Sequence, residues 1–134
     1  MAKPIDIVLR LMDPRADHAA VIAEAWREDC EEFFIGLDLA LNPSYNFKLE
    51  KVPALPDDDE EPGTLTFAQF FNVAVGLSRE RNLPEQVEQI VEDAAMAANA
   101  QEWNLWYRRI LLKSLHKHLP METIQKELIR LTTE

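Results

Sequence analysis

The sequence predicts a single all-α domain of about six helices with one long acidic loop. A chain of 134 residues is long enough to bury one core but too short for two domains of ordinary size. Apolar residues make up 47% of the chain and charged residues 28%, which is typical of a globular protein. Apolar side chains recur at spacings of three and four along most of the chain, and no segment alternates as a strand does. We therefore expect one domain over residues 1–134, with a flexible acidic loop at about 53–63.

Prolines mark the first two predicted helices. Pro4 precedes apolar residues at helical spacing and suits the first turn of a short opening helix. Asp13 followed by Pro14 predicts the N-cap and first turn of a long second helix. We expect that helix to bend near Gly36 and to end before Pro43.

Residues 42–63 predict a loop, because they contain four prolines and the run DDDEE and show no regular period. We expect the acidic run to be solvated or disordered. Capture of a metal ion is the less favoured alternative, since a run of acids fixes no ligand geometry. The lone cysteine, Cys30, lies at helical spacing with apolar residues, which favours a buried structural thiol over a nucleophile.

A third helix is expected to begin after Thr66 as its cap and to end at Asn82. Pro84 then starts a fourth helix, whose acids form a solvent face. Those acids are Glu85, Glu88, Glu92 and Asp93.

Asn99 and Glu102 are three residues apart, like the two members of a capping box. They predict a fifth helix that continues to about His116. Pro120 stands near the start of the last helix, on which apolar residues recur at helical spacing.

The net charge of −10 conceals an asymmetry along the chain. Residues 1–102 hold 8 Lys and Arg against 21 Asp and Glu, a net charge of −13. Residues 103–134 hold 6 against 3, a net charge of +3. Such an imbalance indicates a polar interaction surface on the C-terminal part.

The fifth helix carries both aromatic and basic residues. At about 100° per residue, one side holds a predicted core face, which consists of Trp103, Trp106, Tyr107, Ile110, Leu111 and Ser114. We expect the aromatics to pack in the core rather than to stack on bases. Arg109, Lys113 and His116 fall on the other side, which is either an ordinary solvated face or a surface for phosphate contact.

The connection SLHKHLP favours phosphate contact. A helix that follows a short connection presents free backbone N–H groups at its start, and these can bind phosphate oxygens. Lysines and arginines just before it would strengthen such a site. No Asn, Gln or Arg is clearly aimed at base edges, so the pattern favours gripping the backbone over reading bases. His116 and His118 are two apart, which is poor spacing for a metal pair on a helix.

The chain resembles the N-terminal, all-helical DNA-binding domain of ATP-dependent DNA ligases, most closely the T-even-like bacteriophage type. Three segments carry the resemblance in the same order, and together they span roughly residues 33–128. They are FFIGLDLALNPSYNFKLEKVP, GTLTFAQFFNVAVGLSRERN and EWNLWYRRILLKSLHKHLPMETIQKEL.

In that family the last segment typically reads as an arginine-bearing helix, a Leu-Arg-x-Gly turn and a helix that begins near Thr-Ile or Thr-Val. The matching residues here are Arg108, Arg109, Lys113, Leu115, Thr123 and Ile124. His116 replaces the usual arginine, and His118 or its neighbour replaces the usual glycine. Glycine would allow close approach to a phosphate or a positive φ, and histidine restricts both.

The resemblance implies a module that grips the phosphate backbone of duplex or nicked DNA without sequence preference, in DNA replication or repair. The residues we expect to bind DNA are Arg108, Arg109, Lys113, His116, Lys117 and His118. Peripheral candidates are Lys48, Lys51, Lys126 and Arg130.

A DNA ligase attacks ATP with the lysine of a Lys-x-Asp-Gly motif, and no lysine of this chain begins one. We therefore expect no enzyme activity from this chain on its own, no catalytic residue, no metal site and no cofactor. A nucleotidyltransferase domain and a host or phage protein are alternative protein partners. No run of about 18 apolar residues and no signal-peptide pattern occur, so we expect no membrane contact and a cytoplasmic location, the host cytoplasm for a phage protein.

The second hypothesis is an acidic protein-interaction protein that reuses the ligase fold and imitates DNA or covers a basic partner. It rests on the pI near 4.7 and on the missing arginine and glycine of the turn.

Overall fold

The computed structural model describes residues 3–47, 49, 51–56, 63–79 and 83–133. Over these residues the fold is all-α and contains no strand, so the predicted fold class is confirmed. The helices are α1 (Pro4–Met12), α2 (His18–Arg27), α3 (Glu31–Leu41), α4 (Phe67–Arg79), α5 (Pro84–Ala97), α6 (Ala100–Glu102), α7 (Arg108–Leu111) and α8 (Met121–Thr133). A π-helical turn (Trp103–Tyr107) joins α6 to α7, and a 3₁₀ turn (Leu115–Lys117) precedes α8.

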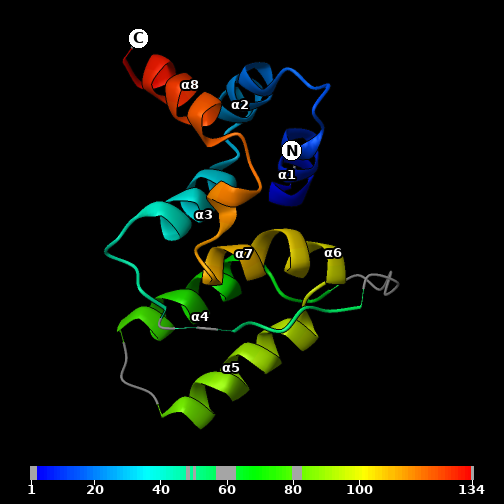
Figure 1. The fold of residues 1–134 in the computed structure, drawn as a ribbon, viewed down its shortest axis with the longest axis vertical. Helices are drawn as coiled ribbons and strands as arrows, with labels where there is room; N and C mark the ends of the chain where they lie inside the picture. The colour runs from blue at the N-terminus through cyan, green and yellow to red at the C-terminus, as the bar shows by residue number, and fades with distance from the viewer. Residues whose placement is uncertain (1–2, 48, 50, 57–62, 80–82, 134) are drawn as a thin grey trace.

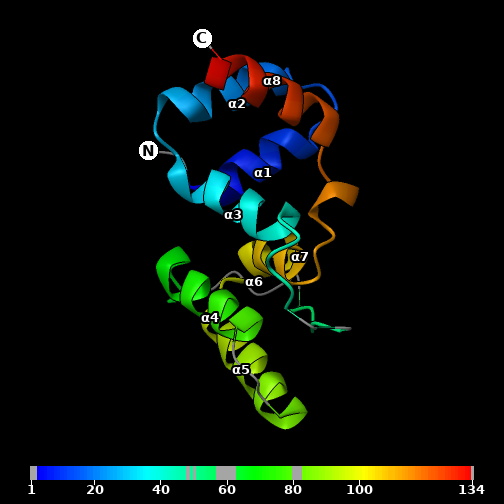
Figure 2. The same ribbon diagram turned by 90° about the vertical axis from the view of Figure 1, so that its left-hand side faces the viewer.

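The helix made of α6, the π-helical turn and α7 lies at the middle of the molecule. Helices α1, α2, α3 and α8 gather on one side of it, and the α4–α5 pair lies on the other (Figure 1). Figure 2 shows the α4–α5 pair extending away from the rest of the fold. Helix α8 packs on α2, which brings the C-terminal helix back to the N-terminal part of the chain.

Most predicted helix starts are confirmed. Pro4 is the first residue of α1, and Pro84 is the first residue of α5. The hydroxyl of Thr66 accepts a hydrogen bond from the backbone N–H of Gln69, whose side chain accepts one from the N–H of Thr66. The side chain of Asn99 caps α6 by accepting from two backbone N–H groups. The expected acids of α5 are exposed to solvent.

The prediction of one long helix from Asp13 to residue 41 is wrong. Asp13 is the C-cap of α1, and the side chain of Asp17 caps α2 instead, accepting from the N–H of Ala20 at 3.2 Å. Asp29 has φ 55° and ends α2, so the chain breaks there rather than bending near Gly36. Periodicity alone did not reveal the break, because the buried faces of α2 and α3 continue one another in the sequence.

Gly36 lies inside α3 and allows a close approach rather than a bend. A Cβ atom there would lie 2.2 Å from the indole ring of Trp106. That ring stacks on Phe33, with centroids 5.5 Å apart and an interplanar angle of 13°. Cys30 is buried, as predicted. Helix α3 therefore packs closely against the π-helical turn of the central helix.

The described part of residues 42–63 is irregular, as predicted. Residues 53–55, however, are hydrogen-bonded to the central helix. The indole N–H of Trp103 donates to the carbonyl of Pro53 at 2.6 Å. The amide of Asn104 donates to the carbonyl of Leu55 and accepts from its N–H, both at 2.8 Å. This part of the predicted flexible loop is therefore held on the central helix. The acidic run at 57–61 lies outside the described residues.

Candidate nucleic-acid interface

The central helix ends at Leu111 instead of continuing to about His116. The backbone N–H of Lys113 donates to the carbonyl of Ile110, and that of Ser114 donates to the carbonyl of Arg109. This pair of bonds is a Schellman motif, in which the residue after the C-cap takes a left-handed conformation. Here that residue is Lys113, with φ 54°, where glycine is the usual choice.

The contacts of the Lys113 side chain explain why a lysine, rather than a glycine, occupies position 113. Its ammonium group donates to the carbonyls of Asn42 and Tyr45, both at 2.6 Å, and lies 5.8 Å from the centroid of the Phe47 ring. Asn42 is the C-cap of α3, so the cation meets the negative end of that helix. Burial lowers the pKa of Lys113, and the carboxylate of Asp38 opposes that shift.

Lys113 is therefore half-buried, and the sequence-based expectation that it forms an exposed stripe with Arg109 and His116 is wrong on this point. The expectation assumed that the helix continues past Leu111.

Arg108 and Arg109 are also half-buried. The Nε–H of Arg108 donates to the carbonyl of Val52 at 2.8 Å, which leaves the two Nη groups outside that bond. The Nη1 atom of the Arg109 guanidinium group lies 3.7 Å from the sulfur of Met12 and donates to it. Burial is the main cause that lowers the pKa of Arg109, and the charge of Arg108 adds to it.

His116, Lys117 and His118 are three consecutive exposed residues in the connection between α7 and α8. Burial slightly reduces the hydration of His118 and lowers its pKa, and four nearby charges act in the same direction. Those charges belong to Arg109, Lys117, His116 and Arg108. Of the six predicted site residues, four are close enough to a fifth, His118, to act on its pKa, and the sixth, Lys113, donates to carbonyls at the end of α3 and just after it. We call these five residues the basic cluster.

The backbone of His118 does not need glycine. Its φ is −119°, which any residue adopts, so the expected cost of replacing a turn glycine there is not present. The left-handed position lies at Lys113 instead. Helix α8 begins at Met121, shortly after the basic cluster, and the N–H of Ile124 donates to the carbonyl of Pro120 in its first turn.

The peripheral candidates differ in their surroundings. Lys51 is exposed and directly precedes Val52, whose carbonyl is bound by Arg108. Lys126 pairs with Glu122 at 3.2 Å, and Arg130 pairs with Glu127, both within α8. Lys48 lies outside the described residues.

Trp103, Trp106 and Tyr107 are buried, which confirms that they pack in the core. The ring of Tyr107 lies 4.4 Å from that of Phe70 between centroids and so joins the central helix to α4. Trp106 keeps a buried indole N–H without a hydrogen-bond partner among the described residues.

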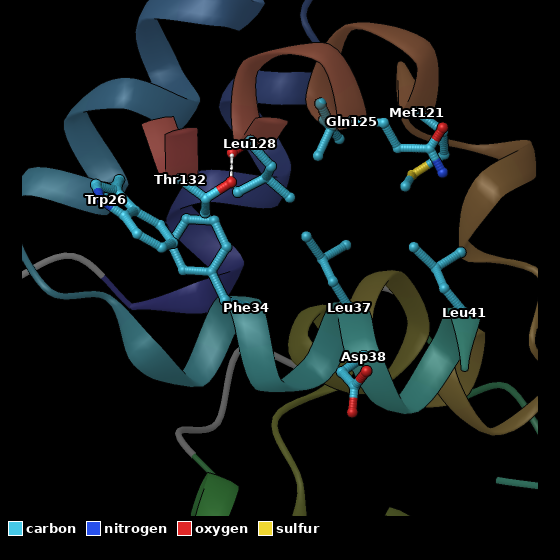
Figure 3. Close-up of a pocket in the computed structure, with 10 residues that line it drawn as sticks. Trp26, Phe34, Leu37, Asp38, Leu41, Met121, Gln125, Leu128 and Thr132 are labelled. Atoms are coloured by element: carbon cyan, nitrogen blue, oxygen red, sulfur yellow. Dashed lines mark hydrogen bonds between the residues drawn. The ribbon is translucent and has the colours of Figure 1, made fainter. Parts of the chain in front are cut away.

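An apolar groove was not expected from the sequence. It has a volume of about 340 Å³ and lies between α3 and α8 (Figure 3). Trp26 and Phe34 stand at one end, and Leu41 and Met121 at the other. The sequence shows the apolar periodicity of α8, but it does not show that α3 lies across the groove from it.

No described helix has the length and apolar character to cross a membrane. Within the described ranges, no three His, Cys, Asp or Glu side chains come together in a way that could hold a metal ion.

Two solved structures share this fold. The chain superposes on the structure named Pmar-Lig_PreS3 with a TM-score of 0.85 and 24% identity, over 99% of this chain and 31% of that one. It superposes on Pmar-Lig_Pre with a TM-score of 0.84 and 25% identity, over 97% of this chain and 30% of that one. No family model and no curated protein match the sequence.

These likenesses define a ligase-related fold. The chain spans less than a third of the length of either solved chain.

Proposed function

We propose that this chain is a DNA-binding module associated with a ligase, and that it grips the phosphate backbone of duplex or nicked DNA without reading sequence. The observation that carries the proposal is the basic cluster, in which three consecutive exposed basic residues are accompanied by two arginines whose charges act on His118, in a chain of net charge −10. Phosphate contacts supply affinity that does not depend on sequence. The ligase-related fold supports the choice of DNA as the partner.

The basic cluster suits a backbone contact in two ways. Lys117 and both histidines are exposed on a short turn, so they can approach a phosphate without loss of core packing. Arg108 is held through its Nε–H, and its two Nη groups, which take no part in that bond, are the groups that a phosphate would bind. The buried aromatics cannot stack on bases, which agrees with a proposal of backbone contact alone.

The proposed activity is binding only. Because no lysine of the sequence begins a Lys-x-Asp-Gly motif, a nucleotidyltransferase domain would have to supply ligation. We place the module in DNA replication or repair in the cytoplasm, that of the host if the chain is encoded by a phage, with no cofactor of its own.

The experiment is fluorescence anisotropy with nicked and intact duplexes of two unrelated sequences. Arg109→Gln combined with Lys117→Gln should lower the affinity at least tenfold, and equally for both sequences. The matched control, Lys3→Gln combined with Arg27→Gln, removes the same charge from exposed sites outside the basic cluster and should change little. Equal losses in the two double variants would sink the proposal, because net charge alone would then explain the binding.

The exposed acids of α5 favour one second candidate, an acidic protein-interaction module that imitates DNA. Under this alternative the chain binds a basic DNA-binding protein and displaces DNA from it. Glu85→Gln, Glu88→Gln and Glu92→Gln together should then abolish displacement, whereas the same triple variant should bind nicked duplex at least as well under the first proposal.

A further inference from the structure

We infer that Lys113 is a positioning residue for the basic cluster rather than a DNA contact, and that the surface it organises includes Lys51. This inference rests on the proposed function and assigns the members of the same site to different roles.

The backbone at Lys113 sets the direction of the turn that follows α7. Its left-handed φ ends the helical path after α7, and the N–H of Ser114 donates back to the carbonyl of Arg109. The following turn is held by its own short-range bonds, since the N–H of Lys117 donates to the carbonyl of Ser114 and that of His118 donates to the carbonyl of Leu115. The direction of the turn is therefore inherited from residue 113.

The side chain of Lys113 connects this turn to a distant part of the chain. The ammonium group binds Asn42 and Tyr45, which are 71 and 68 residues distant in sequence. These bonds close the end of α3 and fix the start of the segment that follows it. One side chain thus ties together the two stretches of chain that hold the exposed cations.

The chain that follows α3 carries a further exposed cation, Lys51. Phe47 is buried next to the ammonium group, and Arg108 binds the carbonyl of Val52. Lys51 is exposed between these two attachments and directly beside the Arg108 anchor. Lys51 therefore supplies a cation beside the Arg108 anchor from a different part of the chain.

The carbonyl bonds of Lys113 leave its ammonium group one N–H for a direct phosphate contact. The ammonium has three N–H groups, and two of them donate at 2.6 Å to carbonyls. Moving the group to a phosphate would break the bond to the Tyr45 carbonyl and leave the Asn42 carbonyl with the N–H of Tyr45 as its remaining donor.

The test is the salt dependence of binding to a nicked duplex, measured by anisotropy for the wild-type chain, Lys113→Met, Lys117→Met, Lys51→Met and the double variant Lys113→Met/Lys117→Met. A lost phosphate contact lowers the log–log salt slope by about 0.9. We expect this loss in Lys117→Met and in Lys51→Met. Lys113→Met should lower the affinity about fivefold with the wild-type slope, because its complex still neutralises the same phosphates once the turn has ordered.

The double variant tests whether Lys113 acts through Lys117. Its affinity loss should be smaller than the two single losses combined, because a mispositioned turn costs less when its lysine is absent. Independent losses would contradict positioning through Lys117.

Circular dichroism checks that each variant is folded, and Lys113→Gly serves as the second variant because it keeps the left-handed turn while losing the ammonium. It too should bind more weakly with the wild-type slope. A slope loss of about 0.9 in Lys113→Met or Lys113→Gly would overturn the inference and make Lys113 a contact, while leaving the proposed function intact. Wild-type affinity in both variants would also overturn it. If the wild-type chain bound no DNA, the proposed function and the inference would fail together.

Discussion

Residues 103–113 and residues 114–118 form adjacent halves of one basic stretch, and the fold uses them in opposite ways. The first half is bonded to chain segments about 50 to 70 residues away through Trp103, Asn104, Arg108 and Lys113. The second half has mainly local bonds and exposes three consecutive basic side chains. A count of basic residues therefore overstates the binding surface, because some cations are occupied in holding the fold together.

The largest expected effect lies at the packed centre of the first half. Gly36→Ala would place a Cβ 2.2 Å from the Trp106 ring, which is enclosed between α3 and the core. We expect a loss of roughly 2–4 kcal/mol in the free energy of unfolding, measured by urea denaturation. Gly76→Ala is the matched control, because a Cβ there meets nothing within 4 Å, and it should stabilise α4 by about 0.5–1 kcal/mol. Equal stability of the two variants would show that the close approach is not a constraint.

A lysine from each half sharpens the comparison. Lys113→Met should lower the free energy of unfolding by about 1.5–3 kcal/mol, because it removes charge-assisted hydrogen bonds to Asn42 and Tyr45. Lys117→Met should stay within about 0.5 kcal/mol of wild type, since that side chain is exposed. Lys113→Gly should recover roughly 1 kcal/mol relative to Lys113→Met by relieving the left-handed backbone. Urea midpoints for the three variants check this order. A larger loss of stability in Lys117→Met than in Lys113→Met would contradict the structural role of Lys113.

The smallest expected effect is the pH dependence of DNA binding. Burial and four nearby charges lower the pKa of His118 in the free chain, so it is largely neutral at pH 7. A phosphate would raise that pKa in the complex, so binding takes up a proton between the two pKa values. Affinity should therefore rise as the pH falls, by roughly threefold from pH 8 to pH 6 at fixed ionic strength.

The variant with His116→Ala and His118→Ala should lose this dependence. If wild type binds equally at both pH values, the histidines are outside the contact surface and the lysine and arginines act without them.

Several local signals in the sequence predict helix starts correctly, although Asp13 followed by Pro14 does not, because Asp13 ends α1. Thr66 and Asn99 mark helix starts because a cap is made by residues two or three apart. The aromatic face of the central helix was likewise visible from periodicity. The sequence predicts His116, Lys117 and His118 among six binding residues, and the structure exposes these three together.

The remaining features depend on contacts between distant residues. Gly36 was interpreted as a bend because its partner, Trp106, is 70 positions away in the sequence. Lys113 was assigned to an exposed stripe because the helical wheel was extended past Leu111, while its true partners are Asn42 and Tyr45. The family resemblance places the glycine position at His118 or its neighbour, whereas the left-handed residue in the structure is Lys113.

The most direct measurement of the central claim is the salt dependence of the wild-type affinity for a nicked duplex. Three exposed side chains, with Arg108 and Arg109 beside them, make several phosphate contacts available. The account predicts a log–log slope of roughly −3 to −4, with binding that weakens steeply between about 50 and 200 mM salt. An affinity that stays constant over that range, or no binding at the low-salt end, would contradict it.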